Sequence, residues 1–230
     1  MPKTLIYVPI IHTSADLGSL AKDVNARGIA DLGEEFWQNH IKTVEGFWDV
    51  LFDYFESLNV KGVKIYQDGM IADGEIGQKI VEEGVRLGSK NYELISSLLK
   101  RGAILVKTEK FEFVKEERDR LLSITQTKSR FQKLLAFLKY KFVKDRLLNQ
   151  RDKFIVQRIK ETLNTDETGM LFIGAYHNIK PKLPKEIQIK EIKEGEKIKE
   201  YQQLLPFGDK IKYQKRFEEL GRYLISKVLV

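Results

Sequence analysis

The sequence predicts an α/β protein with a mostly parallel central sheet flanked by helices. Short apolar segments alternate along the chain with segments of helical periodicity, and this alternation is typical of βαβ units. The apolar segments are nearly continuous, as expected for strands buried on both faces. With 230 residues and 42% hydrophobic residues, the chain suffices for one complete core. We therefore treat residues 1–230 as a single domain.

The first predicted strand covers residues 4–11 and ends at His12. A short helix is expected at 19–25, followed by the clearest helix of the chain. Its apolar residues recur every three or four positions and so share one face: Trp37, Ile41, Val44, Trp48, Leu51, Phe55 and Leu58. Residues 61–67 form the second predicted strand. Asp68 and the following glycine are expected to form a turn after it.

Two helices and a third strand follow. The first helix covers 75–86, with three apolar residues predicted to face inward: Ile76, Ile80 and Val81. The second covers 91–100, and Gly102 fits the left-handed position that closes a helix. The third predicted strand is 103–106.

A long helical insertion or cap is expected at 112–163, with a break near 125–128. The fourth strand is predicted at 170–175 and a fifth at 186–192. A final helix covers 211–228, with one apolar face: Ile211, Phe217, Leu220, Leu224 and Val228.

Composition excludes several classes of site. The chain contains no cysteine, which excludes disulfides, thiolate metal sites and cysteine nucleophiles. Phosphate-loop, dinucleotide-fingerprint and G-x-S-x-G motifs are also missing from the sequence. The apolar run at 5–11 is too short to span a bilayer, and the expected location is the cytoplasm.

The net charge of +7 is concentrated in one segment. Residues 128–160 contain eleven Lys or Arg and two Asp, a local net charge of +9, so the rest of the chain sums to −2. An exposed helix packed by its apolar face explains this pattern, with Phe131, Leu135, Leu138 and Phe142 on that face. Binding to nucleic acid or to an anionic membrane is the alternative.

Polar side chains follow the predicted strands where ligands usually bind. His12 follows the first strand, Asp68 the second, Glu109 the third and His177 the fourth. Parallel α/β sheets bind ligands outside the carboxyl ends of their strands. His12, His177 and Asp68 are therefore a candidate metal-ligand set, which fits zinc, manganese or iron. The third histidine, His40, lies beside the apolar face of its helix and is expected to be structural.

Two short motifs carry a family resemblance. Pro9-Ile10-Ile11-His12 and Gly174-Ala175-Tyr176-His177 resemble the paired G-x-x-H motifs of the TraB/GumN/Tiki group, which is related to the erythromycin-esterase and ChaN-like proteins. Arg151-Asp152 resembles the Arg-Asn or Arg-Asp element that precedes the second motif in that group. The order of these elements matches over residues 4–192.

The chain departs from the group's pattern at two points. Pro9 stands where the first motif has Gly. The group often carries a Glu after its second strand, where this chain has Gln67-Asp68. Asp68 is the best match to that Glu, with Glu75 and Glu109 as rivals.

The resemblance implies a hydrolase of a peptide or an ester, with or without a divalent metal. His12, His177, Asp68 and Arg151 would be the catalytic residues. Arg151 would stabilise negative charge on the substrate, Asp152 would orient a histidine, and Tyr176 would donate a hydrogen bond at the mouth of the site. Two alternatives stay open: a non-catalytic protein that binds a ligand or haem on the same fold, and an adaptor that binds anionic surfaces through 128–160. The sequence leaves the oligomeric state open.

Overall fold

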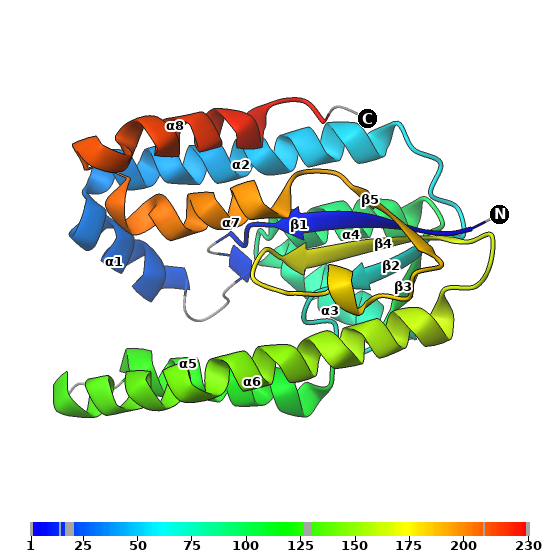
Figure 1. The fold of residues 1–230 in the computed structure, drawn as a ribbon, viewed down its shortest axis with the longest axis horizontal. Coiled ribbons are helices and arrows are strands. Elements are labelled where there is room, and N and C mark those ends of the chain that lie inside the picture. Colours follow the sequence, from blue (N-terminus) through cyan, green and yellow to red (C-terminus); the bar gives the residue numbers. More distant parts are fainter. Residues whose placement is uncertain (1, 14, 17–20, 127–129, 209, 229–230) are drawn as a thin grey trace.

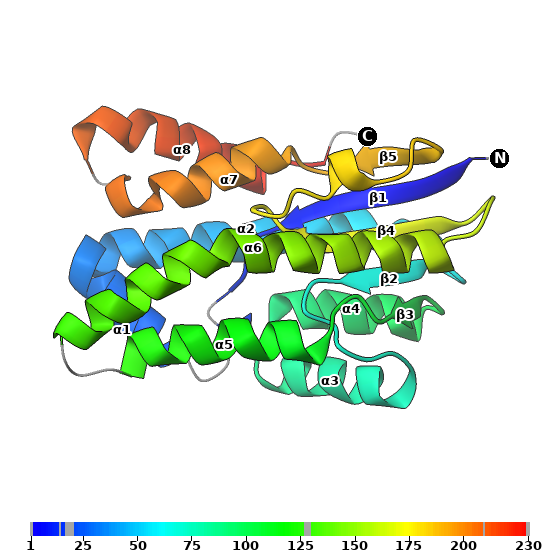
Figure 2. The same ribbon diagram turned by 60° about the horizontal axis from the view of Figure 1, so that its bottom comes forward.

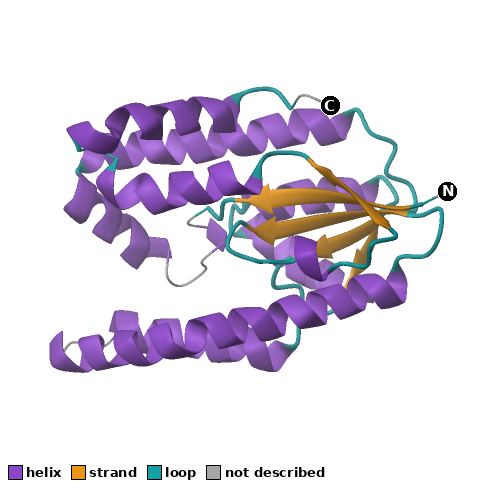
Figure 3. Cartoon of the chain, in the orientation of Figure 1, coloured by secondary structure: helices purple, strands orange, loops and turns teal. Residues whose placement is uncertain are grey.

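The computed structural model describes residues 2–13, 15–16, 21–126, 130–208 and 210–228, and within the helices it leaves undescribed the side chains of 121 and 123–142. Its centre is a sheet of five parallel strands, in the order β3-β2-β4-β1-β5. The strands are β1 (Lys3–Ile10), β2 (Lys64–Gln67), β3 (Ile104–Val106), β4 (Thr168–Gly174) and β5 (Ile187–Glu191). The predicted α/β fold is confirmed, and the strands end along one common edge (Figure 3).

Helices cover both faces of the sheet. They are α1 (Ala21–Leu32), α2 (Glu34–Glu56), α3 (Gly74–Arg86), α4 (Lys90–Lys100), α5 (Phe111–Gln126), α6 (Arg130–Thr162), α7 (Gly195–Leu204) and α8 (Ile211–Ile225), with two short 3₁₀ turns, η2 (Lys180–Lys182) and η3 (Leu205–Phe207). Figure 1 shows α2, α7 and α8 on one side of the sheet and the α5–α6 pair on the other. Among the described helices, none has the length and hydrophobicity that a membrane crossing requires.

The strands are buried on both faces, which explains their continuous apolar sequences. Successive residues of β1 alternate between two apolar clusters: Val8 and Ile10 face the α2 side, and Leu5 and Tyr7 face α6. The strand period of two produces this division. The larger cluster is centred on α2, where Phe47, Trp48, Leu51 and Phe55 are fully buried.

The C-terminal half of α6 closes the opposite face. Ile155 and Ile159 are fully buried against Tyr66 and Leu171. Toward its N-terminus, α6 runs beyond the edge of the sheet beside α5 (Figure 2). The predicted insertion at 112–163 is therefore a helical pair with one half built into the core. Of the predicted break at 125–128, residues 125–126 are the end of α5 and residues 127–128 lie outside the described part of the chain.

Pro9 fits into β1 because β5 is short. The carbonyl of Tyr7 accepts a hydrogen bond from the backbone N–H of Ile192, so odd-numbered residues of β1 turn their backbone groups toward β5. Pairing with β5 ends at Tyr7. The N–H that Pro9 lacks would point past the end of β5, so no ladder bond is lost.

Two local predictions are wrong, and one helix was missed. Ile76 is 66% exposed, because its neighbour Gly77 takes the inward-facing position. Leu105 packs so closely against Gly77 that a Cβ at position 77 would clash with it. Ile211 is 93% exposed at the first turn of α8. The α7 helix was not predicted, since a charged sequence surrounds its two buried residues, Ile198 and Tyr201.

Truncating a side chain on the sheet-facing side of α6 should destabilise the whole domain. We expect Ile159→Ala to lower the free energy of unfolding by about 2–5 kcal/mol, because it leaves a cavity in a fully buried cluster. Urea denaturation followed by circular dichroism measures the change. The matched control, Ile211→Ala on an exposed position, should change it by less than about 0.5 kcal/mol. Equal effects of the two substitutions would contradict the assigned packing of α6.

Candidate functional site

His12, His177 and Asp68 meet at the carboxyl edge of the sheet. Nε2 of His12 lies 3.7 Å from Oδ2 of Asp68, and Nε2 of His177 lies 3.4 Å from the same oxygen. β1, β2 and β4 are neighbours in the sheet, and each supplies one of the three side chains just past its last residue. The structure thus brings together the three residues that sequence analysis selected as a set.

Asp68 is held by contacts to both of its carboxylate oxygens. Nη2 of Arg151 donates to Oδ1 at 2.6 Å, and the backbone N–H of Gly174 donates to Oδ2 at 3.1 Å. A Cβ at position 174 would lie 3.3 Å from Oδ2 of Asp68 and 3.6 Å from Nε2 of His12. The glycine of the second motif therefore keeps the β4 backbone close to the carboxylate.

Arg151 is the cation of a buried ion cluster. Besides Asp68, it donates through Nε to Glu109 at 2.9 Å and through Nη1 to Glu117 on α5. Arg151 is only 8% exposed. Its donors are thus used within the protein, which differs from the expected contact of Arg151 with substrate. Its geometry fits a residue that positions Asp68 and ties α5 and α6 to the sheet.

A second carboxylate orients His177. Oδ1 of Asp152 lies 2.6 Å from Nδ1 of His177, and Oδ2 accepts from the backbone N–H of Asn178 at 3.1 Å and from Lys182 at 2.5 Å. The imidazole of His177 therefore lies between Asp152 and Asp68, with Nε2 toward Asp68. This contact agrees with the orienting role that the family resemblance implies for Asp152, and that role stays a prediction.

His12 is the solvent-exposed residue of the site. Its side chain is 39% exposed, against 5% for His177. Nδ1 of His12 lies 3.8 Å from Oδ2 of Asp16, which also accepts a hydrogen bond from the backbone N–H of Thr13 at 2.6 Å. Sequence analysis missed Asp16, since it lies in a loop where no periodicity marks it. Ser89 fixes Asp16 through its other oxygen.

These charges favour protonated histidines beside ionised aspartates. Burial works against protonation of His177, but Asp68 and Asp152 outweigh it and raise the pKa of His177 to about 9. His12 is partly exposed, and the partial desolvation of its ring also opposes protonation, but hydrogen bonds and charges from Asp16 and Asp68 outweigh this effect and raise the pKa of His12. Burial alone would raise the pKa of Asp68, whereas His177 and Arg151 hold it well below its ordinary value. The site therefore attracts positive charge to the two histidine nitrogens.

Glu109 differs from the other carboxylates. It is fully buried, and burial raises its pKa to about 7 although Arg151 opposes the shift. Its Oε2 has no hydrogen-bond partner among the described residues. Glu75, the other rival to Asp68, is exposed on α3. Asp68 is thus the carboxylate that faces both histidines.

The donor types at this edge fit a divalent cation. As the side chains stand, no three His, Asp or Glu among the described residues are arranged as a metal site. Two imidazole nitrogens and a carboxylate oxygen nevertheless face one another, and Asp152 occupies the far nitrogen of His177. A carboxylate on the far nitrogen is the usual outer partner of a metal-binding histidine. The predicted metal remains a prediction on this basis.

The remaining sequence predictions fall on the periphery. Tyr176 is 41% exposed, and the ammonium of Lys144 lies 5.2 Å from the centre of its ring. Within the basic segment, Arg151 points inward and Arg146 is exposed. The structure does not describe Lys128. It also does not describe the side chains of the apolar face predicted for the basic segment: Phe131, Leu135, Leu138 and Phe142.

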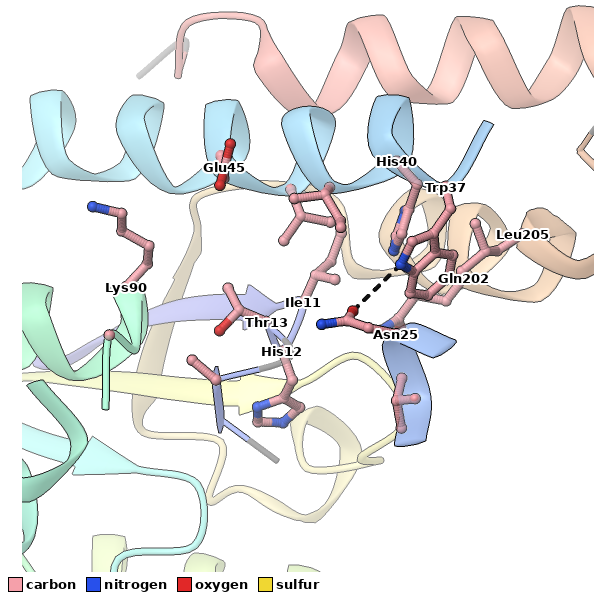
Figure 4. Close-up of a pocket in the computed structure, with 15 residues that line it drawn as sticks. Ile11, His12, Thr13, Asn25, Trp37, His40, Glu45, Lys90, Gln202 and Leu205 are labelled. Carbon is pink, nitrogen blue, oxygen red and sulfur yellow. Dashed lines mark hydrogen bonds between the residues drawn. The ribbon is translucent and has the colours of Figure 1, made fainter. Parts of the chain in front are cut away.

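A cavity of about 330 Å³ opens beside His12 (Figure 4). It lies between α1, α2 and the end of α7, and Figure 4 shows Trp37, His40 and Gln202 grouped at the end away from Glu45 and Lys90. His40, expected to be structural, contacts the hydroxyl of Tyr201 through Nδ1 at 3.0 Å and lines this cavity.

Comparisons with known proteins identify no relative. No family model matches the chain, and no characterised protein or solved structure matches it. The resemblance to the TraB/GumN/Tiki group therefore rests on the residues described above and stays a prediction.

Removing Arg151 should destabilise the protein more at high pH than at low pH. Arg151→Met leaves three carboxylates without their cation, and breaking a buried ion cluster in this way costs about 3–5 kcal/mol. At pH 5 the cost should be smaller, because protonation of Glu109 relieves part of the repulsion. Urea denaturation at pH 5 and pH 8 measures both values. Arg146→Met, on the exposed face of the same helix, is the control and should be nearly neutral.

His40 should make stability fall in mild acid. Burial lowers the pKa of His40 to about 4 in the folded protein, whereas an unfolded histidine titrates near about 6.5. Between these values the unfolded chain binds more protons, so folding stability should decrease as the pH falls from 6.5 to 4. The contribution is on the order of 3 kcal/mol. His12 and His177 are protonated in the folded protein across this window, and below about pH 5.5 they are protonated in the unfolded chain as well, so they contribute little to the acid-induced loss there.

The difference in the free energy of unfolding between wild type and His40→Gln isolates the contribution of His40. Carboxylates that titrate in the same pH window affect both proteins equally. Denaturation curves collected from pH 4 to pH 8 should show a smaller acid-induced loss for His40→Gln. A pH-independent difference between the two proteins would show that His40 is not held neutral.

Proposed function

We propose that this protein is a hydrolase of the TraB/Tiki type that cleaves a peptide or an ester at the edge formed by His12, His177 and Asp68. The observation that carries the proposal is the convergence of two histidine nitrogens on one buried carboxylate oxygen, from three neighbouring strands. The cytoplasmic location expected from the sequence is kept as part of the proposal.

The geometry suggests a division of roles. His12 is the proton-transfer group, because it is the exposed member of the set and borders the cavity. With its raised pKa, His12 is protonated at neutral pH and can donate to a leaving group. His177 is positioned by Asp152, and its protonated ring supplies a fixed positive charge for an oxyanion. Arg151 acts through Asp68 and does not itself contact substrate in this scheme.

A divalent metal is the alternative form of the proposal, in which the ion replaces the protons of His12 and His177. His12, His177 and Asp68 would hold it, and zinc, manganese and iron all suit two imidazoles and a carboxylate. Bound there, the ion would supply a polarised water for hydrolysis. The same carboxylates that raise the histidine pKa values would attract such a cation in place of the protons.

Hydrolysis of p-nitrophenyl esters and of a quenched fluorescent peptide library tests the proposal. We expect His12→Ala and Asp68→Asn each to lower kcat/KM by at least about 100-fold, because each removes a group acting at the reacting centre. Arg146→Met should leave kcat/KM unchanged, and circular dichroism verifies the fold of each variant. If a substrate is found and His12→Ala retains full activity, the assignment of this site is wrong.

Elemental analysis tests the metal directly. Untagged wild-type protein, incubated with Zn²⁺, Mn²⁺ or Fe²⁺ and desalted, should retain close to one ion per chain. The double variant His12→Ala/His177→Ala should retain none, because two of the three ligands are gone. Equal metal content in the two proteins would exclude the metal form of the proposal and leave the acid–base form, in which both histidines keep their protons.

A further inference from the structure

The chain exposes two large apolar side chains where η3 meets α8. Ile211 is 93% exposed, and Phe207 is 44% exposed. Ile211 lies nine residues before Leu220, which α8 buries in the core. Nine residues turn an α-helix by about two and a half turns, so these two side chains lie on opposite faces of α8. The packing of α8 on the domain therefore leaves Ile211 uncovered.

Basic residues surround these apolar side chains. The segment 205–216, which we call the α8 corner, contains four Lys or Arg and one Asp, a local net charge of +3. The ammonium of Lys210 lies 5.0 Å from the centre of the Phe207 ring, and that of Lys212 lies 5.2 Å from the centre of the Tyr213 ring. Phe207 and Tyr213 are neighbours, with ring centres 5.9 Å apart. The α8 corner thus combines exposed apolar surface with positive charge.

Three of these cations have no carboxylate partner in the described part of the chain. The ion pairs that α8 forms there belong to Arg216 and Arg222, whereas Lys210, Lys212 and Lys215 are exposed and take part in none. The first turn of α8 also lacks an acidic residue, although the helix dipole favours negative charge there. These lysines therefore place positive charge where it does not stabilise the helix and where it attracts an anion from outside the protein.

This combination fits the surface of an anionic lipid membrane. Peripheral proteins bind such a surface by burying apolar side chains at the boundary between headgroups and acyl chains, while lysines are attracted to the anionic lipids. The phosphates of a nucleic acid would also attract lysines, but an isoleucine has no ring that stacks on a base and no donor for a phosphate. The exposed Ile211 thus favours a lipid surface.

A second positive segment begins at the same end of the molecule. Figures 1 and 2 place the start of α8 and the start of α6 at one end, and the strands in Figure 3 point toward it. The α6 helix begins within the basic segment 128–160, whose net charge is +9. A membrane at this end would therefore meet positive charge from two parts of the chain, and the carboxyl edge of the sheet would be directed toward it.

We propose that the α8 corner binds anionic lipid membranes, with Ile211 and Phe207 inserted among the lipid headgroups and the exposed lysines paired with lipid anions. This interaction goes beyond the proposed hydrolase function and does not depend on it. A failed search for a substrate would leave the membrane interaction standing, and a failed vesicle experiment would leave the hydrolase assignment standing.

Ile76 is the matched control for Ile211. It is also an exposed isoleucine near the start of a helix, but its neighbours Glu75 and Lys79 carry opposite charges. In Figure 2, α3 lies on the side of the molecule opposite α8. An effect of exposed apolar surface alone would be the same at both positions, whereas membrane docking requires Ile211.

Cosedimentation with sucrose-loaded vesicles tests the proposal, with protein purified without a His tag. Wild type should bind vesicles of phosphatidylcholine mixed with phosphatidylserine, and added salt should weaken this binding because it screens the charges. Ile211→Ser should lower the partition coefficient about tenfold, because it removes apolar surface that the membrane buries. Ile76→Ser should leave the partition coefficient unchanged.

The lysines are tested by removing charge in matched pairs. Lys212→Gln/Lys215→Gln should lower the partition coefficient at least about tenfold, since each lysine near an anionic surface strengthens binding about fivefold. Lys79→Gln/Lys100→Gln removes the same charge from exposed positions on α3 and α4 and should have little effect. Circular dichroism verifies the fold of each variant.

Fluorescence distinguishes insertion from attraction by charge alone. Ile211→Trp adds a tryptophan at the α8 corner, while the native Trp37 and Trp48 are buried and give a constant background. The emission of Ile211→Trp should shift to shorter wavelength when phosphatidylserine vesicles are added, because the indole leaves water. Ile76→Trp should show no shift.

Two results with vesicles would overturn the proposal: no binding of wild type at low salt, and equal binding of wild type and Ile211→Ser. The second would mean that charge alone attracts the protein. A double-stranded DNA oligonucleotide completes the comparison. We expect Ile211→Ser to leave any binding to DNA unchanged, and an equal loss of binding to DNA and to vesicles would also contradict the lipid assignment.

Discussion

The ionised carboxylate of Asp68 is the constraint on which the site and much of the fold depend. It receives Arg151 from α6, the backbone of Gly174 from β4, and two histidines from β1 and β4. A buried charge with this little exposure is stable only when cations and donors surround it. The helical pair α5–α6 therefore does more than cover a face, because Arg151 also bridges to Glu109 and Glu117.

The carboxylates around Asp68 are matched by an equal number of cations. Asp16, Asp68, Asp152 and Glu117 face four cations: His12, His177, Arg151 and Lys182. Glu109 is the additional carboxylate, and its raised pKa allows it to carry a proton near neutral pH. A cation that bound between the histidines would displace their protons, so the resting charge of the site depends on what occupies it.

The sequence was most informative where one physical rule dominated. Continuous apolar segments located the strands, and the topology of a parallel sheet then placed His12, Asp68 and His177 at one edge. It was least informative where the tertiary environment decides. Gly77 displaces Ile76 from the core, Arg151 points inward from a basic segment, and Asp16 reaches the site from a loop. None of these positions has a periodicity that distinguishes it from its neighbours.

The two histidines of the site differ in a way that sequence spacing cannot show. Both follow a strand, but His177 is clamped between two carboxylates and almost fully buried, whereas His12 is open to solvent and to the cavity. Rigid placement suits a group that supplies charge, and access suits a group that exchanges protons with a ligand.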